Sequence, residues 1–150
     1  VYITRGRVIV RGQMVKRGEA KKLDYLLFYK PGIPLAVLEA KDNSHSVGAG
    51  MQQALAYAEL LDVPFAYSSN GDAFLEHDRT GGGRGVEREI SLDQFPSPEE
   101  LWTRYRVWKG YTPGQESVTT QDYYDDGTGK MPRYYQQVAI NRVVDAIARG

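Results

Sequence analysis

The fold is decided by the stretch Leu23-Asp-Tyr-Leu-Leu-Phe-Tyr-Lys-Pro-Gly-Ile-Pro-Leu-Ala-Val-Leu-Glu-Ala-Lys-Asp42. Two apolar runs flank the Pro31-Gly32 pair, and this arrangement predicts a hairpin of largely buried strands. A tight turn centred on the pair would place Lys30 opposite Ile33. The register of the other residues in the hairpin follows from that pairing.

Three charged residues gather at the open end of this predicted hairpin. The register carried back from the turn places Asp24 opposite Glu39, and alternation along a strand places Lys41 on the same face as Glu39. Directly opposed side chains lie about 5 Å apart, and like charges at that separation repel each other. A divalent cation between the two carboxylates would remove the conflict. Lys41 would then point at whatever the cation binds.

The composition excludes several classes of function. The chain has 150 residues, enough for one well-cored domain with an appendage, and its formal net charge is zero. Without a global basic field, we expect any contact with nucleic acid to be local. The sequence has no cysteine, so disulfides and cysteine-based zinc sites are excluded. It shows no signal peptide and no apolar run long enough to span a bilayer, and we expect a cytoplasmic protein without a membrane partner.

The residues before the hairpin predict one strand and one loop. Residues 2–10 alternate between apolar and polar and favour β-structure. Residues 13–22 are polar and basic, and we expect a loop there. The chain begins inside the predicted strand with no preceding helix or cap, which is the pattern of a fragment.

Residues 42–90 predict the rest of a mixed sheet. A helix is expected from about Val47 to Leu61, where apolar residues fall at helical spacing. Residues 65–68 and 73–77 predict two strands joined by a tight turn at Asn70-Gly71, and residues 86–90 predict an edge strand. Without the edge strand, the order of elements is strand, hairpin, helix and two further strands, which indicates an α/β fold.

Residues 95–150 predict two helices and a connection between them. Ser97 and Pro98 form a strong helix start that Glu100 completes as a capping box, and this helix is expected to reach about Val107. Lys109–Pro132 is rich in Gly, Thr, Gln, Asp and Tyr without sustained periodicity, so we expect a linker or an extended wrapping segment. Residues 134–149 have apolar positions at helical spacing.

This pattern resembles the PD-(D/E)XK nucleases. Asp24, the triplet Glu39-Ala40-Lys41 and the helix after it match the family motif, with Leu23 in place of the proline that names it. Gln53 and Tyr57, four residues apart on one helix stripe, match the QxxxY motif of the RecB-like branch. The resemblance implies a restriction-endonuclease-like fold with a central mixed β-sheet flanked by helices. The acidic residue that the family usually carries on a helix before the first strand is absent.

The hairpin is also similar in sequence to the N-terminal nuclease domain of type I restriction enzyme R subunits. The segment Pro132-Arg-Tyr-Tyr-Gln-Gln-Val-Ala-Ile140 resembles the stretch that opens the motor ATPase domain of those subunits. The resemblance implies a nuclease core at residues 1–95, whose N-terminal helix is missing, and a helix and linker at 96–132. Residues 133–150 would be the truncated first helix of the motor. The motor's phosphate-binding loop is absent from this sequence.

The resemblance implies metal-dependent endonucleolytic cleavage of double-stranded DNA by an ATP-driven restriction enzyme. Asp24 and Glu39 would offer hard oxygen ligands to Mg²⁺ or Mn²⁺, with the Ala40 carbonyl as a third ligand. Lys41 would stabilise developing negative charge or orient the attacking water. Gln53 and Tyr57 would position the DNA backbone or brace the lysine.

The same resemblance gives the tail a role in the full-length subunit. Arg133, Tyr135 and Gln136 would lie beside the adenine of ATP, which would be a second cofactor. The modification and specificity subunits of the restriction complex would be the protein partners, and another subunit would supply recognition of the DNA sequence.

Plainer interpretations of these residues stay open. Asp24 and Glu39 are also explained as strand-end charges that face solvent, and Lys41 as an ion-pair partner of Glu39. Gln53 and Tyr57 are also explained as an ordinary polar helix face.

Other residues and other functions also stay open. We expect His45 and His77 on the surface, and Arg84, in a glycine-rich loop, is a further candidate for a DNA contact. The chain could instead hold DNA without cutting it, or dock a translocase onto the modification subunits. Magnesium binding that depends on Glu39 would separate DNA cleavage and DNA holding from subunit docking.

Overall fold

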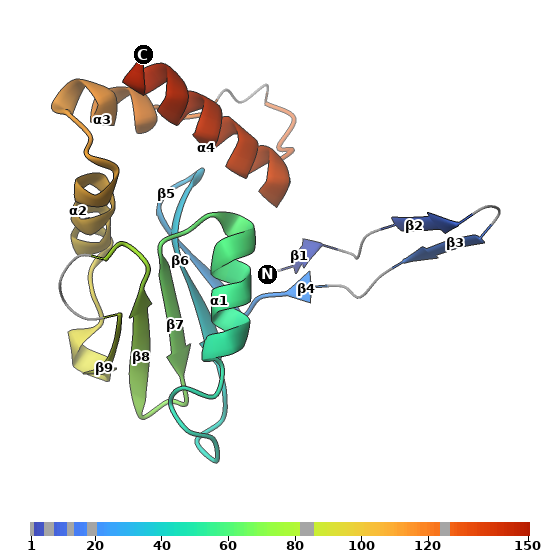
Figure 1. Cartoon of the computed structure of the whole chain (residues 1–150), viewed down its shortest axis with the longest axis vertical. Coiled ribbons are helices and arrows are strands. Elements are labelled where there is room, and N and C mark those ends of the chain that lie inside the picture. Colours follow the sequence, from blue (N-terminus) through green and yellow to red (C-terminus); the bar gives the residue numbers. More distant parts are fainter. Residues whose placement is uncertain (1, 5–7, 12–13, 18–20, 82–85, 124–126) are drawn as a thin grey trace.

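A five-stranded mixed sheet forms the centre of the molecule (Figure 1). The computed structural model describes residues 2–4, 8–11, 14–17, 21–81, 86–123 and 127–150. The strands lie in the order β5-β6-β7-β8-β9, with β6 and β7 parallel and the other neighbours antiparallel. Their bounds are Tyr25–Lys30, Ile33–Ala40, Phe65–Ser69, Ala73–Asp78 and Glu87–Ser91. The predicted central mixed sheet, with helices beside it, is confirmed.

The hairpin β5–β6 has the predicted register. Lys30 pairs with Ile33 and Tyr25 pairs with Leu38, although the ladder is irregular around Phe28. The next step of the register brings Asp24 beside Glu39. Gly32 turns the chain at a φ of +87°, a left-handed conformation that glycine adopts without the penalty of a Cβ.

One helix covers each face of the sheet. Helix α1 (Met51–Leu61) makes the crossover between the parallel strands β6 and β7, and α2 (Pro98–Lys109) packs on the opposite face. On the α1 side the buried cluster contains Leu23, Val37, Met51, Ala54, Tyr57, Ala58, Leu61, Val63 and Ala66. On the α2 side it contains Ile33, Leu35, Ala36, Phe65, Tyr67, Ile90, Leu101 and Trp102. Burial of these two apolar layers stabilises the sheet between the helices.

The α1 helix begins later than expected. The prediction placed its start at about Val47, but the first helical residue is Met51, after Gly50. Two glycines in the preceding turn explain the difference, since glycine lowers helix stability by about 1 kcal/mol relative to alanine. The residues from Asp42 to Gly50 instead form a connection that reaches back to the end of β7.

An arm precedes the hairpin. Strand β1 (Tyr2–Thr4) pairs with β4 (Lys21–Lys22), and β2 (Val8–Arg11) pairs with β3 (Met14–Arg17), both antiparallel. Figure 1 shows this arm extending away from the sheet and helices. The predicted loop at residues 13–22 is therefore wrong over β3 and β4. The backbone groups of a first strand need partners, and a second basic but β-compatible strand supplies them.

The segment after α2 contains an element that the prediction missed. Helix α3 (Pro113–Thr119) lies inside the stretch that was expected to be a linker. Thr112 caps it, Gln115 completes the capping box, and Pro113 occupies the first position, a start signal as strong as the one at Ser97. A short 3-10 turn, η1 (Leu92–Gln94), precedes α2, whose cap is Ser97 as predicted.

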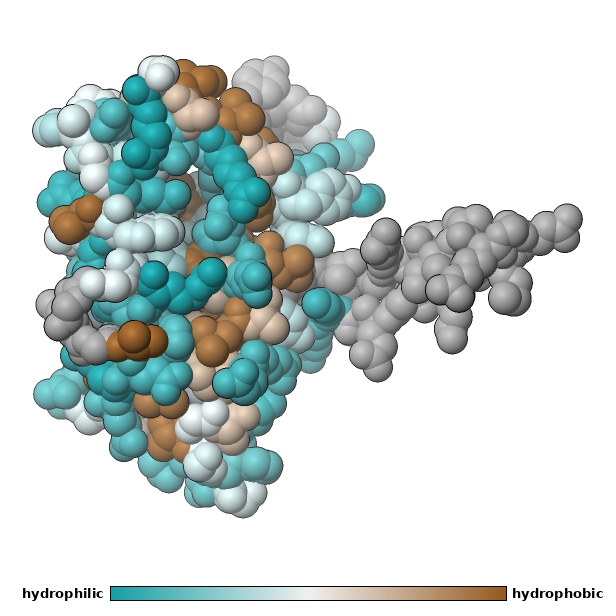
Figure 2. Space-filling view, viewed as in Figure 1, coloured by the Kyte–Doolittle hydropathy of each residue, from teal (hydrophilic) through white to brown (hydrophobic). Residues whose placement is uncertain are grey.

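The last helix, α4 (Tyr134–Arg149), has the predicted bounds and packs against α3 and α1. Part of its apolar surface stays uncovered: Val143 is 57% exposed and Ile147 is 68% exposed. Figure 2 shows apolar residues at the end of the molecule that α4 forms. None of the helices among the described residues is long and apolar enough to cross a membrane.

Candidate active site

Two carboxylates meet at the end of the hairpin that lies opposite its turn. Asp24 directly precedes β5 and Glu39 lies near the end of β6. The Asp24 N–H donates to Glu39 Oε1 at 3.4 Å, and the Ala40 N–H donates to Asp24 Oδ2 at 3.0 Å. Each carboxylate therefore accepts from the backbone of the opposite strand, and this exchange holds the two acids side by side as their register predicted.

Glu39 is a buried acid with an unusual pKa. Its residue is 1% exposed, and burial, followed by the negative charge of Asp24, raises the pKa of its carboxyl to about 7. The backbone hydrogen bond from Asp24 and the charge of Lys41 act in the opposite direction but do not compensate. A solvent-facing strand-end charge would not show this burial, so the plainer interpretation fails for Glu39.

A second buried acid in the same sheet shows what compensation looks like. Glu76 on β8 is also 1% exposed, yet its pKa lies below its ordinary value. Burial alone would raise it, but hydrogen bonds from Arg104, Tyr67 and Arg88, at 2.6 to 3.1 Å, outweigh burial. Glu39 has no such set of cationic donors among the residues that the structure describes. The comparison indicates that the positive charge near Glu39, unlike that around Glu76, does not compensate for burial.

The donor set at this site suits a hard divalent cation. Carboxylate and carbonyl oxygens are the ligands that Mg²⁺ prefers, and Mg²⁺ keeps several of its waters. Asp24, Glu39 and the Ala40 carbonyl can supply such oxygens. Elsewhere, too, the described part of the chain brings no three His, Cys, Asp or Glu side chains together as a preformed metal cage. The residues therefore fit an ion that is partly hydrated and open to substrate.

Lys41 follows β6 and is held at both its ends. Its N–H donates to the Ser69 carbonyl at 2.8 Å, and its Nζ donates to Gln53 Oε1 at 3.4 Å. Within the described residues the ammonium reaches Gln53 and makes no ion pair with Glu39. Gln53 thus contacts the lysine, and its role in bracing Lys41 for catalysis stays a prediction.

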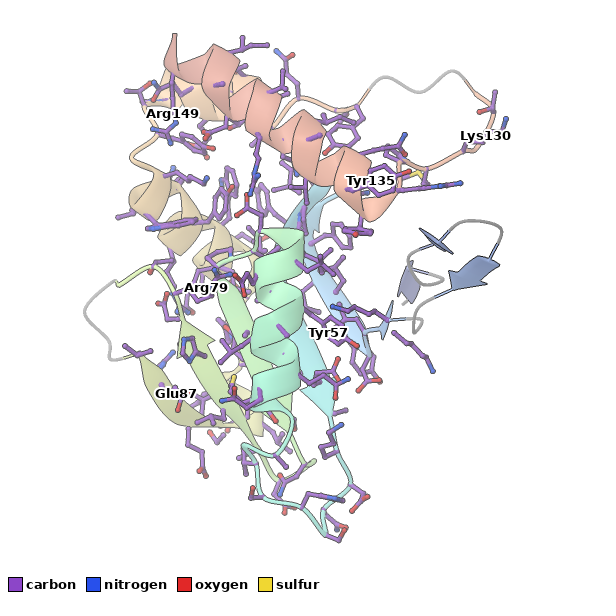
Figure 3. All side chains as sticks on the ribbon, turned by 45° about the vertical axis from the view of Figure 1, so that its right-hand side comes forward. Tyr57, Arg79, Glu87, Lys130, Tyr135 and Arg149 are labelled. Carbon is purple, nitrogen blue, oxygen red and sulfur yellow. The ribbon has the colours of Figure 1, made fainter. Side chains whose placement is uncertain are left out.

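Tyr57 is placed differently from Gln53. It is 8% exposed, and its hydroxyl donates to the Lys22 carbonyl at 2.9 Å. Figure 3 shows Tyr57 on the side of α1 that faces β4. Its hydrogen bond fixes the chain two residues before Asp24. A direct role of Gln53 or Tyr57 in positioning the DNA backbone stays a prediction.

Polar residues at the end of β7 also belong to the site, and the sequence reasoning missed them. Ser68 is fully buried and its Oγ accepts the Gly50 N–H at 3.0 Å, while Asn70 Nδ2 donates to the His45 carbonyl at 3.0 Å. A Cβ on Gly50 would lie 3.0 Å from both Glu39 Cβ and Ser68 Oγ. The available signal was the Ser68-Ser-Asn-Gly71 sequence, because parallel strands end at the same edge of a sheet.

The two histidines lie away from the two carboxylates. His45 Nδ1 lies 3.1 Å from Asp42 Oδ1 on an exposed connection, and His77 Nδ1 lies 2.9 Å from Glu87 Oε1 between β8 and β9. The surface placement of His45 is confirmed, and His77 is half-buried. Arg84 lies outside the described residues.

The residues expected beside ATP cluster at the start of α4. Arg133 Nη1 donates to the Tyr135 hydroxyl at 3.3 Å, and Gln136 Oε1 accepts the Arg133 N–H at 2.8 Å. All three residues are exposed. Gln136 caps the helix in this structure, and the contact of the three residues with adenine stays a prediction.

Comparisons with known proteins agree with the resemblance in the hairpin. The family model for the type I restriction enzyme R protein N terminus matches residues 8–84. The type I restriction enzyme EcoAI endonuclease subunit of Escherichia coli is 54% identical over 151 residues, covering 100% of this chain and 19% of that protein. A structure described as a fragment of an HsdR subunit of a type I restriction enzyme from Vibrio vulnificus YJ016 superposes with a TM-score of 0.82 at 44% identity. It covers 99% of this chain and 27% of that one.

The chain thus spans 19% of the length of the curated relative that it matches. The family model covers more than half of the chain, and the relative is aligned along all of it. The chain therefore belongs to the family of type I restriction enzyme R protein N-terminal regions.

Proposed function

We propose that the chain is the nuclease domain of an ATP-driven type I restriction enzyme R subunit, with a PD-(D/E)XK fold and metal-dependent endonuclease activity on double-stranded DNA. The observation that carries the proposal is the buried Glu39 carboxylate held against Asp24 without compensating cations, next to a lysine braced by Gln53. The E. coli relative is an endonuclease subunit, which supports the class of activity. Mg²⁺ or Mn²⁺ is the cofactor of this site, and ATP is the cofactor of the full-length subunit.

Asp24, Glu39 and the Ala40 carbonyl would hold the cation. When bound, it lowers the pKa of its water and neutralises charge on the phosphate. Glu39 must be ionised to act as a ligand, so the bound cation replaces the proton that burial otherwise favours. The Asp24 backbone and side chain keep the ligands in place through the two hydrogen bonds across the hairpin.

Lys41 acts on the reacting groups. Its ammonium, aimed by Gln53, stabilises the negative charge that develops on the phosphodiester or orients the attacking water. Because the interaction strengthens as charge develops, Lys41 contributes to the transition state more than to binding. Tyr57 keeps the start of β5, and with it Asp24, at the correct distance from Glu39.

Calorimetric titration of Mn²⁺ and Mg²⁺ into the chain tests the metal site. Glu39→Ala should abolish saturable binding, because it removes the buried ligand. Glu59→Ala, at an exposed position of α1, is the matched control and should bind as the wild type does. Equal affinity in wild type and Glu39→Ala would remove the basis of the proposal.

Cleavage is best measured in the full-length subunit, assembled with its modification and specificity subunits on plasmid DNA with ATP. We propose those subunits and double-stranded DNA as partners, and a cytoplasmic location where ATP and DNA are present. If Glu39→Ala no longer nicks the plasmid but still binds DNA, this region is the nuclease. Nicking that persists in Glu39→Ala would leave only a DNA-holding or subunit-docking role for this region.

A further inference from the structure

The neutral net charge of the chain conceals a strong charge separation. Residues 1–22 contain seven of the 19 Lys and Arg residues and one of the 19 Asp and Glu residues. The remaining residues therefore have 12 cations against 18 anions. The arm carries a formal charge of +6, and the rest of the chain carries −6. A nucleic acid approaching this molecule is attracted by the arm and repelled by the average field of the body.

Three of the seven cations of the arm lie on a two-stranded ribbon. Strands β2 and β3 pair through four consecutive residues, from Val8 with Arg17 to Arg11 with Met14. Arg11, Lys16 and Arg17 are register positions of this ribbon and come from both strands. The major groove of B-DNA, about 12 Å wide, admits a two-stranded β-ribbon. Figure 1 shows the ribbon extending away from the sheet and the helices.

The base of the arm is joined to the candidate active site. Strand β4 pairs with β1 and leads directly into Leu23, which is fully buried, and Asp24. Tyr57 holds the carbonyl of Lys22 from α1. Lys21 and Lys22 are exposed, and Lys22 is two residues from a proposed metal ligand. A duplex that reaches Asp24 and Glu39 must therefore pass beside the base of the arm.

We propose that the arm is a duplex-DNA-binding element that contacts the phosphate backbone and the major groove of the DNA next to the cleavage site. The inference rests on the proposed function, since it names where the substrate of that same site is held. It explains how a chain of zero net charge binds a polyanion, and it gives Tyr57 a role in holding the arm and Asp24 in one unit. Arginine and lysine on such a ribbon bind phosphates with little dependence on sequence.

The test measures DNA binding without cleavage. The 150-residue chain is titrated against a short fluorescein-labelled duplex in EDTA, and anisotropy gives Kd over a range of salt concentrations. The variant Arg11→Gln/Lys16→Gln/Arg17→Gln should weaken binding on the order of tenfold or more. It should also lower the slope of log Kd against log salt by about 2 to 3, because each phosphate contact contributes about 0.9.

Two matched variants separate local contacts from global charge and from misfolding. Arg11→Lys/Arg17→Lys keeps the charge and should keep both the affinity and the salt slope. In the second variant, the three glutamines are combined with Glu89→Gln, Asp93→Asn and Glu99→Gln, three exposed acids on β9, η1 and α2. This variant restores a net charge of zero at a distance from the arm and should bind as weakly as the triple variant.

Several results would overturn the proposal. The first is a triple variant that binds DNA with wild-type affinity, and the second is a charge-compensated variant that recovers this affinity in full. The third is a triple variant that self-associates less than the wild type on sedimentation while its DNA affinity is unchanged. The last result would assign the arm to the acidic body of a second copy. Mn²⁺ titration of the triple variant keeps this test apart from the proposed function, because the arm variants should retain the metal site whether or not they bind DNA.

Discussion

Glu39 gives the metal-free chain a pH dependence of definite sign. Its pKa is about 7 in the folded chain and 4.5 ordinarily, so the folded state binds the proton more tightly between these values. Stability is therefore greatest below about pH 4.5 as far as this group is concerned and falls as the pH rises to 7. The full loss is on the order of 3 kcal/mol. Glu39→Gln, a neutral isostere, should remove this slope.

Urea unfolding in EDTA at pH 5 to 8 measures the effect. The acids whose pKa is lowered, such as Glu76 and Asp78, act in the opposite direction, and their contribution is lost as the pH falls below the ordinary acid range. These two acids therefore contribute little to the slope between pH 5 and 7, and the comparison with Glu39→Gln isolates the contribution of Glu39. Glu89→Gln, at an exposed position, should keep the wild-type slope. A Glu39→Gln profile that overlays the wild type would show that the carboxyl is not buried in solution.

Lys41 should affect rate without affecting ligation. Lys41→Ala removes the ammonium that Gln53 aims, so we expect cleavage by the full-length assembly to fall by at least about a hundredfold. Metal and DNA affinity should stay within about twofold of wild type, because the interaction develops in the transition state. Lys41→Arg should also fail largely, since a guanidinium is broader and differently hydrated. Full activity in either variant would exclude the proposed role.

At the scale of elements, the start of α1 packs closely against the ends of β6 and β7. Gly50 has a φ of −89°, which alanine also adopts, so Gly50→Ala meets no backbone strain. Its new Cβ would lie 3.0 Å from Glu39 Cβ and Ser68 Oγ, and both must shift. We expect a destabilisation of about 1 to 3 kcal/mol and weaker Mn²⁺ binding.

Gly114→Ala is the matched control for this prediction. Gly114 lies in α3 with open space around its Cβ position, and the substitution should be neutral or stabilise by up to about 1 kcal/mol. Urea unfolding measures the stability of the two variants, and calorimetry measures their affinity for Mn²⁺. A Gly50→Ala chain as stable as wild type and with unchanged metal affinity would mean that the helix start does not position Glu39.

The elements differ in how far they could be predicted, and the reasons are physical. The register of β5–β6 followed from one turn, because Pro31-Gly32 determines the pairing of every later residue. The predicted start of α1 is too early because two glycines disfavour the first turn, and the cap formed by Thr112 and Gln115 is a local signal for α3 that composition alone does not show. Local signals were present in both cases.

The remaining features of the site depend on packing between distant segments. The sequence pattern brought Asp24, Glu39 and Lys41 together, but the burial of Glu39 depends on α1 and β7, which lie elsewhere in the chain. Tyr57 was assigned to one stripe with Gln53, yet its hydroxyl meets the Lys22 carbonyl, a contact 35 residues away. The Ser68-Ser-Asn-Gly71 sequence indicates a polar strand end, but the contact between Ser68 and Gly50 depends on where α1 begins. Such contacts follow from the three-dimensional fold alone.

At the scale of the whole molecule, α4 is attached to the turn end of the same hairpin that carries the two carboxylates. Asn141 Nδ2 donates to the Gly32 carbonyl at 3.0 Å, and the Tyr123 hydroxyl shares its one proton between the Gly32 carbonyl at 2.9 Å and Asn141 Oδ1 at 2.5 Å. Arg142 pairs with Asp62, at the end of α1, at 2.9 Å. The helix that resembles the opening of the motor thus contacts the β5–β6 hairpin directly.

Asn141→Ala combined with Tyr123→Phe should loosen this attachment. The Gly32 carbonyl would lose the Asn141 amide and the shared Tyr123 proton, and a hydrogen bond contributes about 0.5 to 1.5 kcal/mol, with more lost when a buried acceptor is left unpaired. Hydrogen exchange should therefore show faster exchange of the α4 amides, while the amides of β6 and β7 keep their protection. Arg142→Ala, which breaks an exposed ion pair, is the control and should change α4 protection little. The Asp24–Glu39 end of the hairpin should retain its Mn²⁺ affinity in the double variant, because the lost bonds lie at the turn. Unchanged α4 protection in the double variant would show that apolar packing against α1 and α3, rather than the Gly32 carbonyl, holds the helix on the β5–β6 hairpin.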